Sequence, residues 1–147
     1  MANTNVEIVT PSGSLFSGEA EMVVCRTAGG EIGFLANHMP YLGLLEPGVV
    51  RVVGATGSDR EAGASPTGSS AAGGEIRMAV HSGVVEVRDN QVIMLADVAE
   101  LADDIDVERA RHALQEAEAK ASSSDDDPEA DAALRRAQVR IEVAAGA

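Results

Sequence analysis

Arg136 and Arg140 are the side chains whose type and spacing first suggest chemistry. On a helix they lie one turn apart and share a face, where two like charges repel by about a few tenths of a kcal/mol. No acidic residue stands three or four positions from either arginine. We therefore expect their partner to lie off that helix: an acid of the preceding helix (Glu108, Glu116 or Glu118), water, or a bound anion such as a phosphate chain.

The stretch from Asp103 to Leu114 offers further ligands for an anion. Asp106 can cap a helix by accepting from first-turn N–H groups, and Glu108 suits the positive end of the helix dipole better than Arg109 does. On an alternative interpretation, Arg109 faces the two arginines of the second helix and together they hold a polyanion. Asp106 or Glu100 would then accept a hydrogen bond from an amino or hydroxyl group. From the residues alone we favour the cap.

The sequence offers few side chains suited to nucleophilic catalysis or metal binding. The histidines His38, His81 and His112 are scattered, without metal-type spacing to a second ligand, and Cys25 has no base near it in sequence. No nucleophile elbow, zinc-protease motif or phosphate loop occurs. We expect His81 on a strand facing solvent or another subunit, and His112 on the exposed face of a helix. No catalytic or metal-binding residue is predicted, and a hydrolytic enzyme built on His38 and His81 is the weakest hypothesis.

The composition suits one ordinary domain, or a small domain with an appendage. Of the 147 residues 45% are hydrophobic but only 2% are aromatic, so the core must be aliphatic. A formal net charge of −13 repels phosphates, which argues against nucleic acid as a partner. The lone Cys25 fits a reduced cytoplasmic setting. Neither a secretion signal nor an apolar run of roughly 18 residues is present, so we expect membrane contact only through a partner.

Short β-type runs broken by turn residues extend from Asn5 to about Ala99. Alternating apolar and polar residues on both sides of Asp89-Asn90 predict a hairpin. Strands at this spacing predict an antiparallel β-sandwich or barrel over residues 1–100. The clearest strands are expected at Glu21–Cys25, Glu31–Leu35, Val49–Val53, Ile76–His81, Val84–Arg88 and Gln91–Leu95.

Two segments depart from the strand pattern. Gly54–Gly74 has almost no side chain that can pack in a core, which predicts a flexible, solvated insertion between two strands, or alternatively a partner-binding loop. After Asp104 the apolar period becomes helical, and Pro128 after Asp127 marks the start of a second helix. Residues 101–147 are therefore predicted to form an antiparallel α-helical hairpin.

The apolar stripes of the two predicted helices are mostly alanine. They consist of Val107, Ala110, Leu114, Ala117 and Ala121 in the first helix and Ala130, Leu134, Ala137 and Ile141 in the second. At about 25 cal/mol per Å², an alanine seam stabilises a helix pair less than a leucine seam. Isolated helices of about 15 residues are already marginal in water. We expect a hairpin that can open or detach from the sandwich, although small residues also allow a close, stable pairing.

A connected series of short motifs runs through the chain and is specific as a series, although each motif is weak alone. The motifs are Ile8-Val9-Thr10-Pro11-Ser12-Gly13, Phe16-Ser17-Gly18-Glu19, Gly30-Glu31-Ile32-Gly33-Phe34-Leu35 with His38 and Pro40, Pro47-Gly48-Val49-Val50-Arg51, His81-Ser82-Gly83-Val84-Val85-Glu86-Val87 and Leu95-Ala96-Asp97-Val98-Ala99-Glu100. In this order they resemble the epsilon subunit of the bacterial F-type ATP synthase. The resemblance runs from Val6 to Ile141 and omits the insertion.

The resemblance implies an N-terminal antiparallel β-sandwich of about ten strands followed by a C-terminal helical hairpin, in agreement with the pattern. It implies a non-catalytic central-stalk subunit that couples rotation of the c ring to the catalytic head of a proton-translocating ATP synthase. The sandwich would bind the gamma subunit and rest on the c ring. The hairpin would either extend to the catalytic head and restrain ATP hydrolysis or fold down on the sandwich. The protein would be peripheral, at the cytoplasmic face of the cell membrane.

By the same analogy, the segment from Glu31 to Pro40 would lie near gamma and the c ring. The candidate contact residues are Glu31, Ile32, Gly33, Phe34, His38 and Pro40. Ala36-Asn37 stands where the family usually has Pro-Gly, so the loop departs from the family pattern at this point.

Some family members bind ATP on the folded-down hairpin through a motif Ile/Leu-Asp-x-x-Arg-Ala, which residues 105–110 match at every fixed position. The resemblance makes these the candidate ATP ligands: Glu100, Ile105, Asp106, Arg109, Ala110, Arg136 and Arg140. Glu116 stands where ATP-binding members carry a basic residue, so we expect weak or absent binding. No cofactor is required, ATP being a possible regulatory ligand only. A stand-alone ATP-sensing module is the alternative function.

Overall fold

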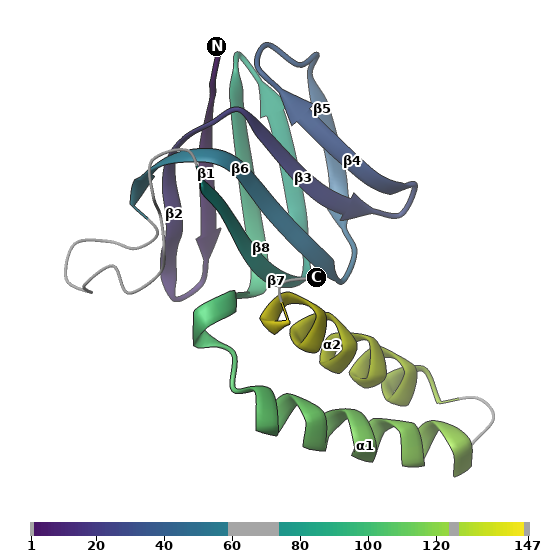
Figure 1. Ribbon diagram of the computed structural model, residues 1–147. Helices are drawn as coiled ribbons and strands as arrows, with labels where there is room; N and C mark the ends of the chain where they lie inside the picture. Colours follow the sequence, from purple (N-terminus) through teal and green to yellow (C-terminus); the bar gives the residue numbers. More distant parts are fainter. Residues whose placement is uncertain (1, 59–73, 124–126, 146–147) are drawn as a thin grey trace.

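A computed structural model describes residues 2–58, 74–123 and 127–145 of the chain. Figure 1 shows a β-sandwich with two antiparallel helices at one end and the N-terminus at the other. The strands of the described residues are β1 (Thr4–Thr10), β2 (Gly13–Ala20), β3 (Met22–Thr27), β4 (Gly30–Leu35), β5 (Tyr41–Leu45), β6 (Gly48–Ser58), β7 (Gly74–Arg88) and β8 (Gln91–Leu101). They are followed by the 3-10 turn η1 (Ala102–Asp104) and the helices α1 (Val107–Ser123) and α2 (Pro128–Ala144).

The strands form one hydrogen-bonded network that curls back on itself. Its order is β4-β3-β5-β7-β6-β2-β1-β8, and β8 also pairs with β7, which closes the network. The β1–β8 pairing is parallel and the others are antiparallel. The predicted fold, a mainly antiparallel sandwich followed by a helical hairpin, is confirmed.

The described residues contain eight strands rather than the expected ten or so. One reason is that the two strands predicted at Ile76–His81 and Val84–Arg88 are a single strand, β7. Gly83 adopts φ +148°, a conformation that other residues rarely take, and an added Cβ would overlap the carbonyl oxygen of Leu95 on β8. The pairing of β7 with β8 shifts register on both sides of Ser82, next to this glycine. The glycine therefore lets β7 bend where the sequence pattern predicted a break.

The core between the sheet layers is aliphatic apart from two phenylalanines. Phe16 and Phe34 are both fully buried. The largest other fully buried side chains are Ile8, Met78, Met94, Val23, Val50, Val52, Val80, Val85 and Val92. Cys25 is buried among them, and burial, with a smaller effect of Glu31, raises the pKa of its thiol to about 12.

The predicted insertion begins later than its composition suggested. β6 continues to Ser58, and β7 begins at Gly74. The expectation of a loop was therefore wrong for residues 54–58 and for Gly74, because backbone pairing between Ala55 and Gly74 extends the sheet without needing large side chains. Residues 59–73 of the predicted loop lie outside the described residues.

Both helices begin as predicted. The Asp106 carboxylate accepts from the backbone N–H of Arg109 at 3.0 Å, and Asp127 caps α2 by accepting from Glu129 and Ala130. The seam between the helices is built from buried alanines, as expected: Ala110, Ala117, Ala130 and Ala137. Neither helix in the described part of the chain has the length and apolar character of a membrane span.

The hairpin is folded down against the sandwich through α2. In Figure 1, α2 lies between the β-sheet and α1, and it packs on β6 and β7. Val139 and Val143 of α2 form a small buried cluster with Ala79 of β7, and the half-buried Val49, Ala102 and Ile105 surround it. This small apolar contact, which we call the docking cluster, is separate from the main core.

Candidate functional site

An ion pair joins the second helix to the sandwich beside the docking cluster. Nε of Arg140 lies 2.7 Å from Oε2 of Glu100, near the end of β8. Both side chains are about two-thirds buried, at 27% and 32% exposure. Glu100 is paired with Ala79 across β8 and β7, which places its carboxylate beside the apolar contact. As predicted, Arg140 has a partner outside its own helix, but this partner is Glu100 of β8 rather than an acid of α1.

Arg136 finds a partner on its own helix, contrary to the expectation from the sequence. It donates to Glu129 at 2.7 Å, two helical turns towards the N-terminus. Seven residues turn an α-helix by nearly two full revolutions, so the two long side chains lie on the same face and can meet. The expectation was wrong because it considered neighbours only one turn away. Of the acids proposed on α1, Glu108 pairs with Arg111 and Glu116 approaches His112 at 3.8 Å.

His81 is buried, and the expectation that it faces solvent or another subunit was wrong. Its side chain is only 3% exposed, and Nε2 lies 3.9 Å from the Glu100 carboxylate, too far for a hydrogen bond. Neither ring nitrogen has a hydrogen-bond partner among the described residues. Burial lowers the pKa of His81, as do Arg140 and, more weakly, Arg136, whereas Glu100 opposes the shift. His112, by contrast, is exposed on α1 as predicted.

The fixed positions of the ATP-type motif have structural tasks in this conformation, except one. Ile105 packs against the docking cluster, Asp106 caps α1, and Ala110 is buried in the helix seam. The cap interpretation of Asp106 is therefore confirmed. The Arg109 guanidinium is exposed and forms no ion pair with the described residues. Arg109 is thus the motif residue whose side chain the fold does not itself use.

The structure brings Glu100 and Arg140 into contact but engages Arg136 elsewhere. Two carboxylates, those of Glu100 and Glu129, occupy the positions around the arginines that an anion would take. The described residues contain no cluster of side chains that could hold a metal ion. An ATP site formed by the seven candidate ligands stays a prediction.

The predicted contact segment consists of most of strand β4 and the turn that follows it, at the end of the sandwich away from the helices (Figure 1). Asn37 adopts the left-handed conformation at φ 59°, which asparagine tolerates better than most residues, and its N–H donates to the Asn90 side chain at 2.8 Å. The His38 ring packs edge-on against Phe34 with centroids 5.0 Å apart. His38 Nδ1 donates to the Met39 carbonyl at 2.7 Å. Asn37 thus supplies a left-handed turn conformation of the kind that glycine adopts at no steric cost.

The six candidate contact residues differ in exposure. Glu31, Gly33 and Pro40 are exposed, whereas Ile32 and His38 are half-buried. Phe34 lies in the core, so it can act only by supporting His38. Glu31 also forms an ion pair with Arg51 at 3.4 Å.

An apolar surface that the sequence analysis did not single out crosses four strands. Leu44, Val84, Leu95 and Val9 are paired in one row across β5, β7, β8 and β1, so their side chains share a face. The next row contains Leu42 and Ile93, with Glu86 paired between them and Glu7 beyond Ile93. Leu42, Leu44 and Leu95 are 72%, 69% and 56% exposed. We call these two rows the leucine face. The signal in the sequence was Leu42-Gly43-Leu44-Leu45, which is apolar on both faces of a strand.

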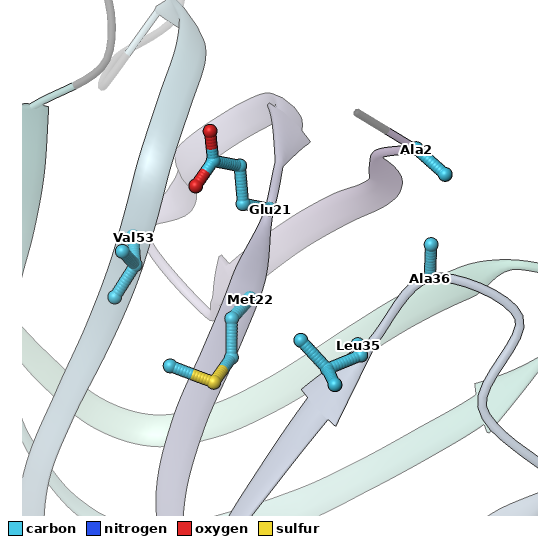
Figure 2. A pocket seen from close by; sticks show the side chains of 6 residues that line it. All are labelled: Ala2, Glu21, Met22, Leu35, Ala36 and Val53. Carbon is cyan, nitrogen blue, oxygen red and sulfur yellow. The ribbon is translucent and has the colours of Figure 1, made fainter.

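A shallow pocket of about 340 Å³ lies at the end of the sandwich away from the helices. Figure 2 shows its lining, which is apolar apart from one carboxylate: Ala2, Glu21, Met22, Leu35, Ala36 and Val53. A single acid without a second polar group does not define a ligand orientation. The pocket therefore does not compete with the hairpin as the candidate ligand site.

Two family descriptions match the chain. Residues 3–65 match the β-sandwich domain of the ATP synthase delta/epsilon chain, and residues 103–145 match its long α-helix domain. Together they cover more than half of the chain and correspond to the two parts of the structure.

Similar proteins agree with this assignment. The chain is 45% identical over 141 residues to an ATP synthase epsilon chain of Thermobifida fusca, covering 95% of this chain and 90% of that protein. It is 39% identical to that of Streptomyces griseus, with 98% and 97% covered. A chain in a cryo-EM structure of the Euglena gracilis mitochondrial ATP synthase has the same fold, with a TM-score of 0.66 at 22% identity over 99% of this chain and 79% of that one. With its sandwich, its hairpin and these relatives, the chain belongs to the epsilon-chain family of ATP synthases.

Proposed function

We propose that this chain is a central-stalk subunit of a proton-translocating F-type ATP synthase, in which it transmits rotation between the c ring and the catalytic head. As an epsilon chain it is a non-catalytic subunit of the synthase. The observation that carries the proposal is family membership along the whole chain, joined to a sandwich that exposes an apolar face. The similar Euglena and Tetrahymena chains come from structures that contain the c ring, the second described as central stalk with c ring. The chain would act peripherally, at the cytoplasmic face of the cell membrane.

The gamma subunit is the proposed occupant of the leucine face. Three leucines more than half exposed on one surface are costly to leave in water, and exposed apolar side chains gathered in this way mark a protein interface. The sandwich beneath it is closed by hydrogen bonds, so this face is rigid. The turn at residues 36–40 and Glu31, near the other end of β4, are the proposed contacts with the c ring and gamma.

Binding to a purified gamma subunit tests this assignment. The double variant Leu44→Arg/Leu95→Arg places two charges on the leucine face, so we expect at least about tenfold weaker binding. Ser12→Arg/Thr56→Arg adds the same charge at exposed positions outside the two rows and is the matched control. Equal affinity of both double variants would place the gamma contact elsewhere, and failure of the wild-type chain to bind or to enter the synthase would refute the proposed function.

The hairpin is the proposed restraint on ATP hydrolysis. It is held to the sandwich mainly by the small docking cluster and by few ionic contacts, so undocking exposes little apolar surface. Such an element can exist in two positions that differ by about a few kcal/mol. In the extended position it would reach the catalytic head.

A truncation after Asp104 tests the restraint. It removes both helices but keeps Leu101, which is buried in the main core. If the hairpin is a brake, ATP hydrolysis by the reconstituted synthase rises on truncation while gamma binding is unchanged. Equal hydrolysis with the full and the truncated chain would show that the hairpin does not restrain this enzyme.

A second candidate function is an ATP site on the docked hairpin, with Glu100, Ile105, Asp106, Arg109, Ala110, Arg136 and Arg140 as ligands. The support is the motif match together with the exposed Arg109, whose guanidinium forms no ion pair within residues 2–58, 74–123 and 127–145. Since Arg140 is held by Glu100 and Arg136 by Glu129, a nucleotide would have to displace these carboxylates. We infer that the affinity is weak.

Isothermal calorimetry with ATP tests this site. Arg109→Ala is the informative variant because the described fold does not use its guanidinium, so a lost binding signal reports on the ligand rather than on folding. Arg111→Ala, which removes an exposed arginine paired with Glu108, is the control. No heat with the wild-type chain, or equal heat in Arg109→Ala, would argue against a nucleotide role.

A further inference from the structure

We propose that His81, Glu100 and Arg140 form a pH-sensitive latch between the sandwich and the hairpin, and that protonation of His81 releases α2. The latch is a property of the isolated chain. Its consequence for the enzyme rests on the proposed role of the hairpin as a restraint on hydrolysis.

The geometry places a titratable ring at the docking surface. Val80 points into the main core, and Ala79, on the opposite face of β7, contacts α2. His81 lies where the pairing of β7 with β8 shifts register, and its ring is buried beside Glu100 and Arg140. The ring is buried while both of its nitrogens lack a hydrogen-bond partner among the described residues. A charge on this ring would be desolvated as long as α2 stays in place.

The Glu100 carboxylate is already paired with Arg140 when His81 takes up a proton. Its Oε2 lies 2.7 Å from Arg140 Nε and 3.9 Å from His81 Nε2. A protonated His81 would therefore compete with Arg140 for one carboxylate and stand close to a like charge. His81 and Glu100 belong to paired strands of the sandwich, whereas Arg140 belongs to α2. The side chain displaced in this competition is therefore Arg140.

The charged groups on the surrounding elements do not remove this conflict. Arg136 on α2 adds to the positive potential, although it is paired with Glu129. On β6, Arg51 pairs with Glu31 and Glu75, and beyond β5 Glu46 approaches Arg135 of α2 at 3.7 Å. The 3-10 turn carries the exposed Asp103 and Asp104. Among these groups, Glu100 is the one that favours the protonated ring.

The direction of the pH effect follows from the change in the pKa of His81 when α2 undocks. In the docked chain, burial first and then Arg140 and Arg136 lower the pKa of His81 below its ordinary value of 6.5. Undocking removes the two arginines of α2 and leaves Glu100, so the pKa of the ring rises. The undocked state therefore binds more protons, and docking weakens as the pH falls from the undocked towards the docked pKa. Docking is strongest above the undocked pKa, where His81 is neutral in both states.

For the enzyme, the latch would couple acidification to release of the hairpin. A released hairpin can extend to the catalytic head and restrain hydrolysis, if the proposed function holds. The chain would then limit ATP consumption when the surrounding solution becomes acidic.

Two measurements on the full-length chain test the latch. The first is the NMR titration of the His81 ring protons. The second is hydrogen exchange of the α2 amides between about pH 7.5 and 5.5, corrected for the intrinsic exchange rate at each pH. With an undocked pKa near 6.5, the ratio of undocked to docked chain rises at most about tenfold over this range.

Matched variants isolate the ring. His81→Gln cannot take up a proton, so the pH dependence of α2 exchange should disappear, whereas His112→Gln removes an exposed histidine of α1 and should leave it unchanged. Val139→Ala/Val143→Ala weakens the docking cluster without adding charge and should raise the pKa of His81. The same pH dependence in His81→Gln as in wild type, or a His81 pKa that is not lowered in the docked chain, would overturn the proposal.

Hydrolysis by the reconstituted synthase at the same two pH values separates the latch from its proposed consequence. If exchange shows the latch but hydrolysis responds to pH equally with wild-type and His81→Gln chains, the latch stands and the restraint by the hairpin fails. Gamma binding at both pH values verifies that the sandwich remains attached.

Discussion

Arg140 on α2 lies 2.7 Å from Glu100 on β8, although 40 positions separate them in the sequence. This ion pair and the small docking cluster beside it hold the hairpin against the sandwich. Because both side chains are partly buried and the pair is close, it contributes more than a typical surface salt bridge. The position of the hairpin therefore depends on a few side chains.

Replacing Arg140 by glutamine should favour undocking of the hairpin. The change removes the ion pair and leaves a shorter, uncharged polar side chain, so we expect docking to weaken by about 1 kcal/mol. Faster hydrogen exchange in α2, with unchanged exchange in the strands, would show this. Arg135→Gln is the control, because Arg135 is 54% exposed and lies 3.7 Å from Glu46. If both variants exchange alike, the close ion pair has no special weight.

Enlarging the alanine seam should separate the two helices. Ala137 is 1% exposed between α2 and its surroundings, so Ala137→Leu has no room and should cost about 1–3 kcal/mol of hairpin stability. Ala119→Leu adds the same side chain at an exposed position of α1 and should be nearly neutral. Thermal unfolding followed by circular dichroism compares the two. A stable Ala137→Leu chain would mean that the seam is loosely packed.

Substituting Gly83 should damage the sandwich itself. Alanine would have to adopt φ +148° and its Cβ would overlap the carbonyl oxygen of Leu95, so Gly83→Ala should destabilise the fold by at least about 2 kcal/mol. Gly33→Ala is the matched control, because its Cβ would come no closer than 3.4 Å, to the flexible Met22 side chain, and would touch Val24 at an ordinary 3.8 Å. Urea unfolding of both variants measures the difference, and equal midpoints would show that β7 can bend without a glycine.

Much of the fold could be predicted because short-range patterns determine it. The alternation on either side of Asp89-Asn90 predicted the hairpin between β7 and β8, where both residues adopt positive φ. Asp106 and Asp127 predicted the helix starts, because capping needs only the next three residues. Two strands were predicted where β7 is one, because a glycine after a serine suggests a turn and only the pairing with β8 shows a bent strand.

The candidate site was predictable in its residues but not in its contacts. The lowered pKa of His81 depends in part on Arg140 and Arg136 of α2, more than 50 positions away in the sequence, and no local pattern records this. The same holds for Arg140 and Glu100, which meet only when the hairpin is docked. The leucine face arises from the alignment of four strands, which sequence alternation alone does not reveal.

The thiol of Cys25 should be inert while the chain is folded. Its pKa is raised from 9.0 to about 12, mainly by burial, so almost no thiolate forms below about pH 10. The raised pKa means that the unfolded state releases a proton first, so this group lowers stability as the pH rises above 9.0. A thiol reagent at pH 8.5 should react with Cys25 only after denaturant is added. Rapid labelling of the folded chain would show that β3 opens locally.

Reversing the charge of Glu116 should strengthen any binding of ATP. Glu116 is exposed on α1, and its one ion-pair partner in the described part of the chain is His112, at 3.8 Å, so the fold tolerates its replacement. An arginine there would attract the phosphates instead of repelling them, and one charge-assisted contact is worth about 1.5–3 kcal/mol, or roughly tenfold or more in affinity. Glu118→Arg makes the same charge change two residues away, on a different face of the helix, and should have a much smaller effect. Calorimetry with ATP on the two variants measures the contrast. Equal gains would indicate a general reduction of negative charge, whereas a gain confined to Glu116→Arg that Arg109→Ala abolishes would place the nucleotide beside α1.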